Sequence, residues 1–411
     1  MKILLIVGDG MADRPLKELG GLTPLEAAKP MNMDRLATSG ISGFMNALSL
    51  GVAPGSDVAN LAILGYDPHR VYTGRGGFEA VGAGIELRDD DLAFRCNFAT
   101  IDSAFNVLDP RAGRIGDEAR ELTEALGDIR LKSAPNIQVI FKHTLGFRGV
   151  LVLRGEGLSE KIELKAPEAG LKIDDIRPTD DSEGAKLTAE ILREFVKETY
   201  RILRDHPINR RRRGRGLPPA NAIIPWGVGR RPHLKSFREL YGLRGACVAA
   251  VSLIKGICRL ADMTVIEVRG ATGDVDTDTL AKAEAAIEAL EKHDLVFLHV
   301  EGPDEASHDG DLEGKLTIIR KIDAMIGKIM SHISLDEACI ALMADHTTSL
   351  RLRRHTADPT PISIAYAEAL RDDVQHYSER EALRGGLGRI KGIEVMPMLM
   401  NIIGRAEKFG L

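Results

Sequence analysis

Short aliphatic segments that end at glycine or at acidic residues recur along this chain. Residues 3–7 form one such segment, which breaks at Gly8-Asp9-Gly10. A short, uninterrupted apolar run bounded by glycine is typical of a parallel strand that is buried on both faces. Because ligands of open α/β sheets bind beyond the carboxyl ends of the strands, Asp9 is placed where an active-site carboxylate is expected.

The same arrangement returns in the C-terminal half. The sequence predicts strands at residues 295–300, 339–344 and 362–365, and helices at residues 279–292 and 312–330. A polar loop at 301–311 is expected after the first of these strands, and Asp345-His346 follow the second. This alternation predicts an α/β fold with a mostly parallel sheet and helices on both faces.

The middle of the chain has a different pattern. Between about residues 90 and 230 we expect short strands, for example at 149–154, a long helix near 184–205 and a basic loop at 210–215. We interpret residues 86–235 as a smaller α+β domain inserted into a discontinuous domain of residues 1–85 and 236–411. The charge block Arg210–Arg213 is either a solvated loop or an anion-attracting rim beside an active site.

Composition excludes several classes of protein. The 411 residues are 44% hydrophobic and 28% charged, which is ordinary for a globular enzyme. The formal net charge of −5 gives no support for nucleic-acid binding. No apolar stretch approaches the roughly 20 residues of a membrane span, and the N-terminal apolar run is too short for a signal peptide. The four scattered cysteines suggest free thiols. We therefore expect a cytoplasmic protein without nucleic-acid or membrane partners.

Acidic and histidine residues gather at the predicted strand ends. They are Asp9, Asp304, His308, Asp345, His346 and His355. Asp304 and His308 are four residues apart, so a helical turn or a compact loop could point both at one ion. Each pair is weak alone, but three such features after aliphatic strands indicate a metal site. Mixed carboxylate and imidazole ligands suit zinc, manganese or iron better than calcium.

Ser56, in the segment A-P-G-S-D-V-A-N-L, is the candidate nucleophile. Gly55 permits a tight turn, and the apolar spacing after Ser56 predicts the start of a helix. Ser56 is then either an ordinary N-cap or a nucleophile at a helix N-terminus. Backbone N–H groups there favour a phosphate anion, and a metal on the hydroxyl would lower its pKa.

Two other motifs carry no function. Asp274, Asp276 and Asp278 imitate the start of a calcium-binding EF-hand, but the required glycine and glutamate are absent. Gly74-Arg75-Gly76-Gly77 does not match the nucleotide-binding P-loop. A turn between the two domains is the simpler interpretation of this glycine-rich segment.

Longer motifs extend from Met1 nearly to the C-terminus. They are G-D-G-M-A-D, P-G-S-D-V-A-N, Y-T-G-R-G-G-F-E-A-V-G-A-G, R-C-N-F-A-T, G-A-T-G-D-V-D-T, and A-D-H-T-T followed by H-T-A-D-P-T-P. In content and order they resemble the cofactor-independent phosphoglycerate mutases of the archaeal-type branch, which belong to the alkaline phosphatase superfamily. The resemblance implies one metal held by Asp9, Ser56, Asp345 and His346, and a second held by Asp304, His308 and His355.

The resemblance also implies an activity. It is the interconversion of 3-phosphoglycerate and 2-phosphoglycerate, in glycolysis or gluconeogenesis, through a phosphoserine on Ser56. Two divalent ions (manganese, zinc or cobalt) are expected, without 2,3-bisphosphoglycerate. The outer domain is then the metal-binding, phosphatase-like one, and the inserted domain binds substrate. The only partner expected is this small-molecule substrate, with the chain a monomer or a homo-oligomer.

Several residues are candidates for contacts with the substrate. Lys255, placed just after a predicted strand at 248–253, resembles the family's phosphate-contacting lysine. A glycerate carboxylate favours a bidentate arginine, for which Arg114 and Arg230 are candidates, although surface salt bridges are the alternative. Asn97 and Arg148 complete the predicted substrate-binding set.

The sequence departs from the family pattern at four places. Asn60 and Gly149 replace expected histidines, Trp226 replaces an arginine, and Thr348-Ser349 replaces a threonine-proline pair. None of these changes removes an expected metal ligand, so they bear on how the substrate is held.

Three other functions remain open at this stage. A phosphatase or phosphopentomutase would share the same metal core, because fold does not determine substrate. A mutase-like homoserine kinase is weakened by the lack of a recognisable nucleotide loop. A non-enzymatic binding protein would have no need for seven metal-type ligands and a serine at a helix N-terminus.

Overall fold

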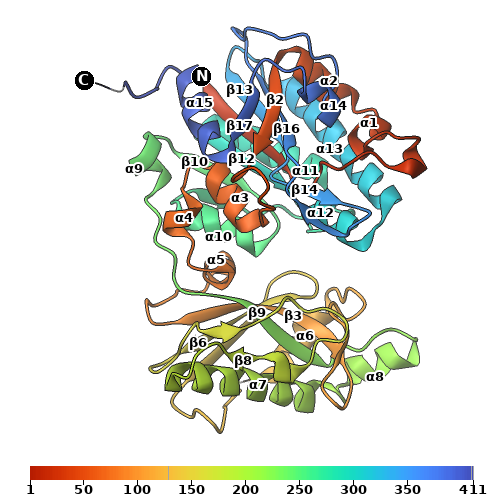
Figure 1. Cartoon of the computed structure of the whole chain (residues 1–411), viewed down its shortest axis with the longest axis vertical. Coiled ribbons are helices and arrows are strands. Elements are labelled where there is room, and N and C mark those ends of the chain that lie inside the picture. Colours follow the sequence, from red (N-terminus) through yellow and green to blue (C-terminus); the bar gives the residue numbers. More distant parts are fainter. Residues whose placement is uncertain (128, 409, 411) are drawn as a thin grey trace. The chain divides into compact units, whose positions relative to one another are not determined.

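The computed structural model describes residues 1–127, 129–408 and 410. The chain forms two compact units, one of Met1–Val71 with Leu234–Leu411 and one of Tyr72–His233 (Figure 1). The second unit is a continuous segment inserted into the first. Helix α5 (Arg75–Gly82) belongs to the second unit because it packs on β3 (Leu92–Ile101) and β9 (Ala222–Gly229). The unit boundary therefore lies between residues 71 and 72, before the predicted position at 85.

An eight-stranded sheet forms the centre of the first unit. Its order is β11-β10-β12-β1-β13-β16-β2-β17. The bounds are β11 Thr264–Ile266, β10 Gly245–Val248, β12 Leu295–Val300, β1 Lys2–Gly8, β13 Ala338–Met343, β16 Thr360–Ala365, β2 Gly40–Asn46 and β17 Gly388–Lys391. Only β16 runs antiparallel to its neighbours in this sheet. The prediction of an α/β fold with a mostly parallel sheet is confirmed.

Helices cover both faces of this sheet, which explains the uninterrupted apolar strands. One face packs against α1 (Pro24–Ala28), α2 (Met31–Thr38), α11 (Thr279–Lys292) and α13 (Leu312–His332). Figure 1 shows α3 (Ser56–Ile63), α10 (Ser252–Leu260) and α15 (Val395–Ile402) on the opposite side. The side chains of β1 from Ile3 to Val7 are therefore fully buried on both faces of the sheet. Each large aliphatic side chain buried in this way contributes about 1.5–3 kcal/mol.

The second unit is an α+β structure with its own core. Its five-stranded sheet consists of β3, β4 (Val107–Asp109), β5 (Gln138–His143), β6 (Arg148–Arg154) and β9, with β3 paired to β4, β6 and β9. The short strands β7 (Ile162–Glu163) and β8 (Arg177–Pro178) pair separately. Helix α7 (Glu183–Leu203) packs on this sheet through Leu192 and Phe195. Helix α6 (Glu118–Leu126) contributes Ala119 and Leu122 to the same core.

The two longest helices of the described residues, α7 and α13, have 21 residues each and mix charged with apolar positions. None of the helices in the described part of the chain is long and apolar enough to cross a membrane.

Three predicted elements differ in the structure. Residues 210–214 of the predicted loop are helical in α8 (Pro207–Gly214), since Pro207 is pre-organised for the first helical turn and His206 caps it. The predicted polar loop at 301–311 contains α12 (Gly302–Asp309). The predicted strand at 248–253 ends at Val248, and α10 begins at Ser252, so Lys255 lies on a helix.

The basic block is not a uniformly solvated segment. Arg212 is buried and donates to Glu118 Oε2 at 2.6 Å and to the carbonyls of Ala112 and Pro218. Arg213 binds the carbonyl of Arg204. At least Arg212 therefore stabilises the second unit.

A buried ionic network lies where α13 meets the loop after β1. Lys315 Nζ is 3.1 Å from Asp13 Oδ2 and 2.8 Å from the carbonyl of Thr348. Glu379 accepts hydrogen bonds from Thr23 Oγ1 and from the backbone N–H of Asp13. Removing one partner of such a pair usually costs about 3–5 kcal/mol, so the network holds these loops firmly.

Glu379 makes the stability of the protein depend on pH. Burial raises the pKa of Glu379 to about 7, whereas an unfolded glutamate titrates near about 4.3. Its contribution is fully present below the unfolded pKa and is lost as the pH rises through 7. Between pH 5 and pH 8 the melting temperature of the wild type should therefore fall relative to that of Glu379→Gln. Calorimetry in EDTA measures this difference.

Glu381→Gln, on the same short helix, is the control and should keep the pH profile of the wild type. Parallel profiles for the wild type and Glu379→Gln would contradict the assignment.

Candidate functional site

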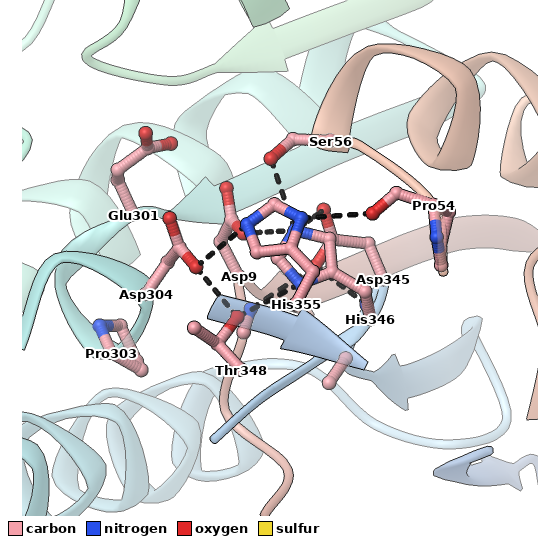
Figure 2. Close-up of polar contacts among 12 residues, drawn as sticks. Asp9, Pro54, Ser56, Glu301, Pro303, Asp304, Asp345, His346, Thr348 and His355 are labelled. Atoms are coloured by element: carbon pink, nitrogen blue, oxygen red, sulfur yellow. Dashed lines mark hydrogen bonds and ion pairs between the residues drawn. The ribbon is translucent and has the colours of Figure 1, made fainter. Parts of the chain in front are cut away.

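The seven residues predicted as metal ligands meet at one edge of the first unit's sheet, and Figure 2 labels all of them except His308. Their elements are the end of β1, the start of α3, helix α12, the end of β13, and β15 (Arg354–Thr356). The seven are Asp9, Ser56, Asp304, His308, Asp345, His346 and His355. The parallel strands β1, β12 and β13 all end at this edge, where ligands of open α/β sheets bind.

One half of the cluster surrounds His346. Its Nε2 lies 3.1 Å from Ser56 Oγ, 3.1 Å from Asp9 Oδ1 and 3.6 Å from Asp345 Oδ2. All four side chains are buried. An imidazole nitrogen, a hydroxyl and two carboxylates therefore converge on one small volume.

The other half of the cluster surrounds Asp304. Its Oδ1 lies 3.3 Å from His355 Nε2, and its Oδ2 lies 3.4 Å from His308 Nε2. The second ring nitrogens bind backbone carbonyls, His308 Nδ1 that of Arg353 and His355 Nδ1 that of Pro54. These contacts fix the rings with Nε2 toward the cluster, which is the usual arrangement of metal-binding histidines.

Ser56 is not an N-cap in the structure. It is the first residue of α3, Gly55 occupies the cap position, and no side-chain cap bond forms. Its hydroxyl contacts His346 Nε2 instead. Ser56 thus combines the N-terminus of a helix, which favours anions, with an oxygen directed at the cluster.

The charges of the cluster match a cation. Burial, together with the neighbouring Asp345 and Asp304, raises the pKa of Asp9 well above its usual value. Neither carboxylate oxygen of Asp9 has a hydrogen-bond partner among the described residues. Buried carboxylates without donors are costly unless a positive charge compensates them. The donor set therefore fits divalent ions.

The histidines compensate Asp304. Burial alone would raise the pKa of Asp304, but hydrogen bonds from His308 and His355 hold it well below its usual value. Burial lowers the pKa of His308, yet its contact with Asp304 outweighs this and raises the pKa to about 9.

His299 and Glu301 were not among the predicted site residues. His299 Nε2 is 3.3 Å from Asp9 Oδ2, and its Nδ1 is 4.0 Å from Glu301 Oε2. The available signal was an imidazole inside the continuous apolar strand β12. His299 is fully buried there and faces the unpartnered side of Asp9.

Asn60, at a position where the family pattern predicts histidine, supports the site directly. Its side-chain amide donates to Asp345 Oδ2 at 2.8 Å and to the carbonyl of Ser56 at 2.7 Å. A neutral donor here orients a carboxylate without adding charge.

Lys255 and Arg230 form ion pairs within their own units. Lys255 Nζ is 2.5 Å from Glu267 Oε2. Arg230 is 2.6 Å from Glu160 Oε2. Arg230 thus forms the salt bridge that was the alternative to a substrate contact, with Glu160 as its partner. To bind a substrate carboxylate, Arg230 would have to release Glu160.

Asn97 and Arg148 lie together in the second unit. They are paired residues on the antiparallel strands β3 and β6. Trp226 Nε1 donates to Asn97 Oδ1 at 3.2 Å, and the Arg148 guanidinium lies over the ring of Phe147. Arg114 occupies a left-handed turn after β4, with φ of 53°.

Comparisons with known proteins agree with one another. Residues 37–209 match the family described as 2,3-bisphosphoglycerate-independent phosphoglycerate mutase. The protein of that name numbered 1 in Methanocaldococcus jannaschii is 48% identical over 411 residues, covering 100% of this chain and 99% of the relative. Its counterpart in Methanothermobacter thermautotrophicus is 46% identical and covers both chains fully.

Two solved structures extend the comparison. A protein from Pyrococcus horikoshii is 39% identical, with a TM-score of 0.82 over 100% of this chain and 99% of that one. A cofactor-independent phosphoglycerate mutase from Thermoplasma acidophilum is 34% identical, with a TM-score of 0.62 over 98% and 100%.

The charge of the cluster predicts that Asp9→Asn stabilises the metal-free protein and weakens the stabilisation that a metal ion provides. Asp9→Asn removes one of three neighbouring buried carboxylates, so the metal-free variant should melt at a higher temperature than the wild type. Manganese should raise the melting temperature of the wild type by several degrees, because a ligand at 100 times its Kd stabilises by about 2.7 kcal/mol. The same addition should raise that of Asp9→Asn less.

Asp309→Asn, at the exposed end of α12, is the matched control and should respond to manganese as the wild type does. A metal-free Asp9→Asn protein that melts lower than the wild type, with an unchanged manganese response, would show that Asp9 is not held for a cation.

Proposed function

The chain belongs to the 2,3-bisphosphoglycerate-independent phosphoglycerate mutase family, and from this premise we propose how its residues interconvert 3-phosphoglycerate and 2-phosphoglycerate. Ser56 carries the phosphoryl group between the two positions of glycerate. The observation that carries the proposal is the Ser56 hydroxyl, which lies at a helix N-terminus and 3.1 Å from His346 Nε2. A reaction of this kind serves glycolysis or gluconeogenesis.

Two divalent ions are part of this proposal. Asp9, Ser56, Asp345 and His346 would hold one, and Asp304, His308 and His355 the other; manganese, zinc and cobalt suit these donors. Ions bound there would lower the pKa of the Ser56 hydroxyl and neutralise charge on the phosphoryl oxygens.

The steps on the chain's own atoms follow from the position of Ser56. Its Oγ attacks the substrate phosphorus in line, so that the Ser56 O–P bond forms while the ester bond to glycerate breaks. The Ser56 hydroxyl loses its proton in this step, and the departing glycerate oxygen takes up a proton. Glycerate then reorients, and its other hydroxyl loses its proton and attacks the phosphoserine phosphorus. The Ser56 O–P bond breaks, and the serine oxygen takes up a proton. The backbone N–H groups at the start of α3 favour the phosphoryl group both on the substrate and on Ser56.

Glycerate must be retained between the two transfers, since water would otherwise hydrolyse the phosphoserine. We assign this retention to the arginines of the second unit, with Arg114 and Arg230 as carboxylate ligands and Asn97 and Arg148 as further contacts. A guanidinium binds a carboxylate through two parallel hydrogen bonds, which suits retention of a small anion. Lys255 is proposed to contact the phosphoryl group.

The full-length relatives favour the mutase over the rival functions. The relatives from Methanocaldococcus jannaschii, Methanothermobacter thermautotrophicus and Thermoplasma acidophilum are described as phosphoglycerate mutases and not as phosphatases, phosphopentomutases or kinases. These relatives match the whole chain, including the second unit. A protein that shared only the metal-binding core would not match there.

Replacement of the nucleophile gives the first functional test. Ser56→Ala should abolish mutase activity, while the fold persists because the lost hydroxyl makes no cap bond. Activity is assayed with 3-phosphoglycerate, without 2,3-bisphosphoglycerate, and folding by circular dichroism. Ser39→Ala is the control, because the half-buried Ser39 hydroxyl bonds the carbonyl of Arg35, outside the cluster. A folded Ser56→Ala protein with near-normal turnover would reassign the nucleophile.

Glycerate retention gives the second test. Arg230→Ala or Arg114→Ala should raise the ratio of free phosphate to 2-phosphoglycerate, because glycerate escapes and water competes. Arg231→Ala is the matched control, since Arg231 is the neighbouring arginine and pairs with the exposed Asp89. The products are measured together after incubation with 3-phosphoglycerate. Unchanged ratios in both variants would remove these arginines from the account.

A further inference from the structure

Thr348 connects the two halves of the cluster. Its Oγ1 lies 2.6 Å from Asp304 Oδ1 and 3.0 Å from His346 Nδ1 (Figure 2). A carboxylate can only accept, so the hydroxyl proton of Thr348 goes to Asp304. The lone pair of the hydroxyl then accepts a hydrogen bond from a protonated Nδ1 of His346.

We propose that Thr348 is a positioning residue that fixes the tautomer of His346 and thereby assigns its Nε2 to the ion held beside Ser56. His346 contributes to two possible ligand groups, one with Asp304 and His355 and one with Asp9 and Asp345. The hydroxyl occupies Nδ1, which leaves the unprotonated Nε2 facing Ser56 and Asp9. The same hydroxyl holds Asp304 Oδ1 in the second group.

The position of this hydroxyl is tightly determined by packing. Thr348 is fully buried on β14 (Thr347–Ser349), opposite His355 on β15. A Cβ on Gly10, which has φ of 59°, would lie 2.5 Å from Thr348 Oγ1 and 2.8 Å from Asp304 Oδ1. Only glycine therefore allows the hydroxyl to reach both partners beside the Asp9 backbone.

The backbone of Thr348 is held as firmly as its side chain. Its N–H donates to the carbonyl of Ala12 at 3.3 Å, and its carbonyl accepts from Lys315 Nζ at 2.8 Å. Lys315 is itself paired with Asp13. The buried ionic network thus fixes the distance between the hydroxyl and both halves of the cluster. Partners that orient metal-binding histidines commonly change metal affinity about 10–100-fold when removed.

The test compares two substitutions that separate the hydroxyl from the shape of the side chain. Thr348→Val keeps the shape and should weaken manganese binding about 10–100-fold, measured by titration calorimetry on the full chain. Thr348→Ser keeps the hydroxyl and should bind within a few-fold of the wild type. Thr347→Val is the matched control, because the hydroxyl of this adjacent threonine donates to the carbonyl of Asp358. Normal binding by Thr348→Val, or equal weakening by Thr348→Val and Thr348→Ser, would overturn the proposal.

A measurement on the wild type tests the tautomer without any variant. Two-dimensional ¹⁵N NMR of the metal-free chain with labelled histidine should show His346 protonated at Nδ1. A ring with no proton on Nδ1 would overturn the proposal. The inference rests on the ion sites proposed above, but separate results test the sites and the role of Thr348. A wild type that binds no manganese would contradict the ion sites, while the NMR result decides the role of Thr348.

Discussion

Three carboxylates, Asp9, Asp304 and Asp345, are buried within one small volume at the edge of a parallel sheet. Their mutual repulsion and loss of hydration oppose folding, and the histidines around them compensate only part of this charge. The rest of the first unit makes such a cluster possible. Strands β1 and β13 are buried on both faces and deliver Asp9 and Asp345 to fixed points, and α12 rises directly from β12 with Asp304 and His308 one turn apart.

Rigidity around the cluster comes from groups that carry no chemistry themselves. Lys315 and Asp13 tie α13 to the loop that follows β1 and to strand β14, and Asn60 ties α3 to Asp345. Ser56 therefore stands on an element that is bonded to one of the proposed ligands. Catalytic groups that must act on a phosphoryl group benefit from such support, because displacements of about 1 Å are enough to cost large factors in rate.

Much of this arrangement could be predicted from the sequence, for physical reasons. An apolar strand that ends at Gly8-Asp9-Gly10 predicts a buried strand with a carboxylate at its tip, and the same logic located Asp345 and His346. Helix α11 has the bounds predicted for it, 279–292, because the helical pattern of this segment is a local signal. The side-chain contacts of His299, Thr348 and Lys315 join segments distant in sequence, so no local pattern could have shown them. A run of arginines does not by itself indicate a helix, so the sequence predicts a loop for the basic block. The contact of Arg212 with the partly exposed Glu118 joins segments distant in sequence and has no local signal.

The most direct measurement of the central claim is the chemical state of Ser56 during turnover. The manganese-loaded wild type is mixed with 3-phosphoglycerate, quenched in acid within milliseconds, digested and analysed by mass spectrometry. The account predicts a phosphate on the peptide that contains Ser56, absent when substrate is omitted. Turnover to 2-phosphoglycerate with no phosphate on Ser56 at any quench time, or with phosphate on another residue, would contradict it.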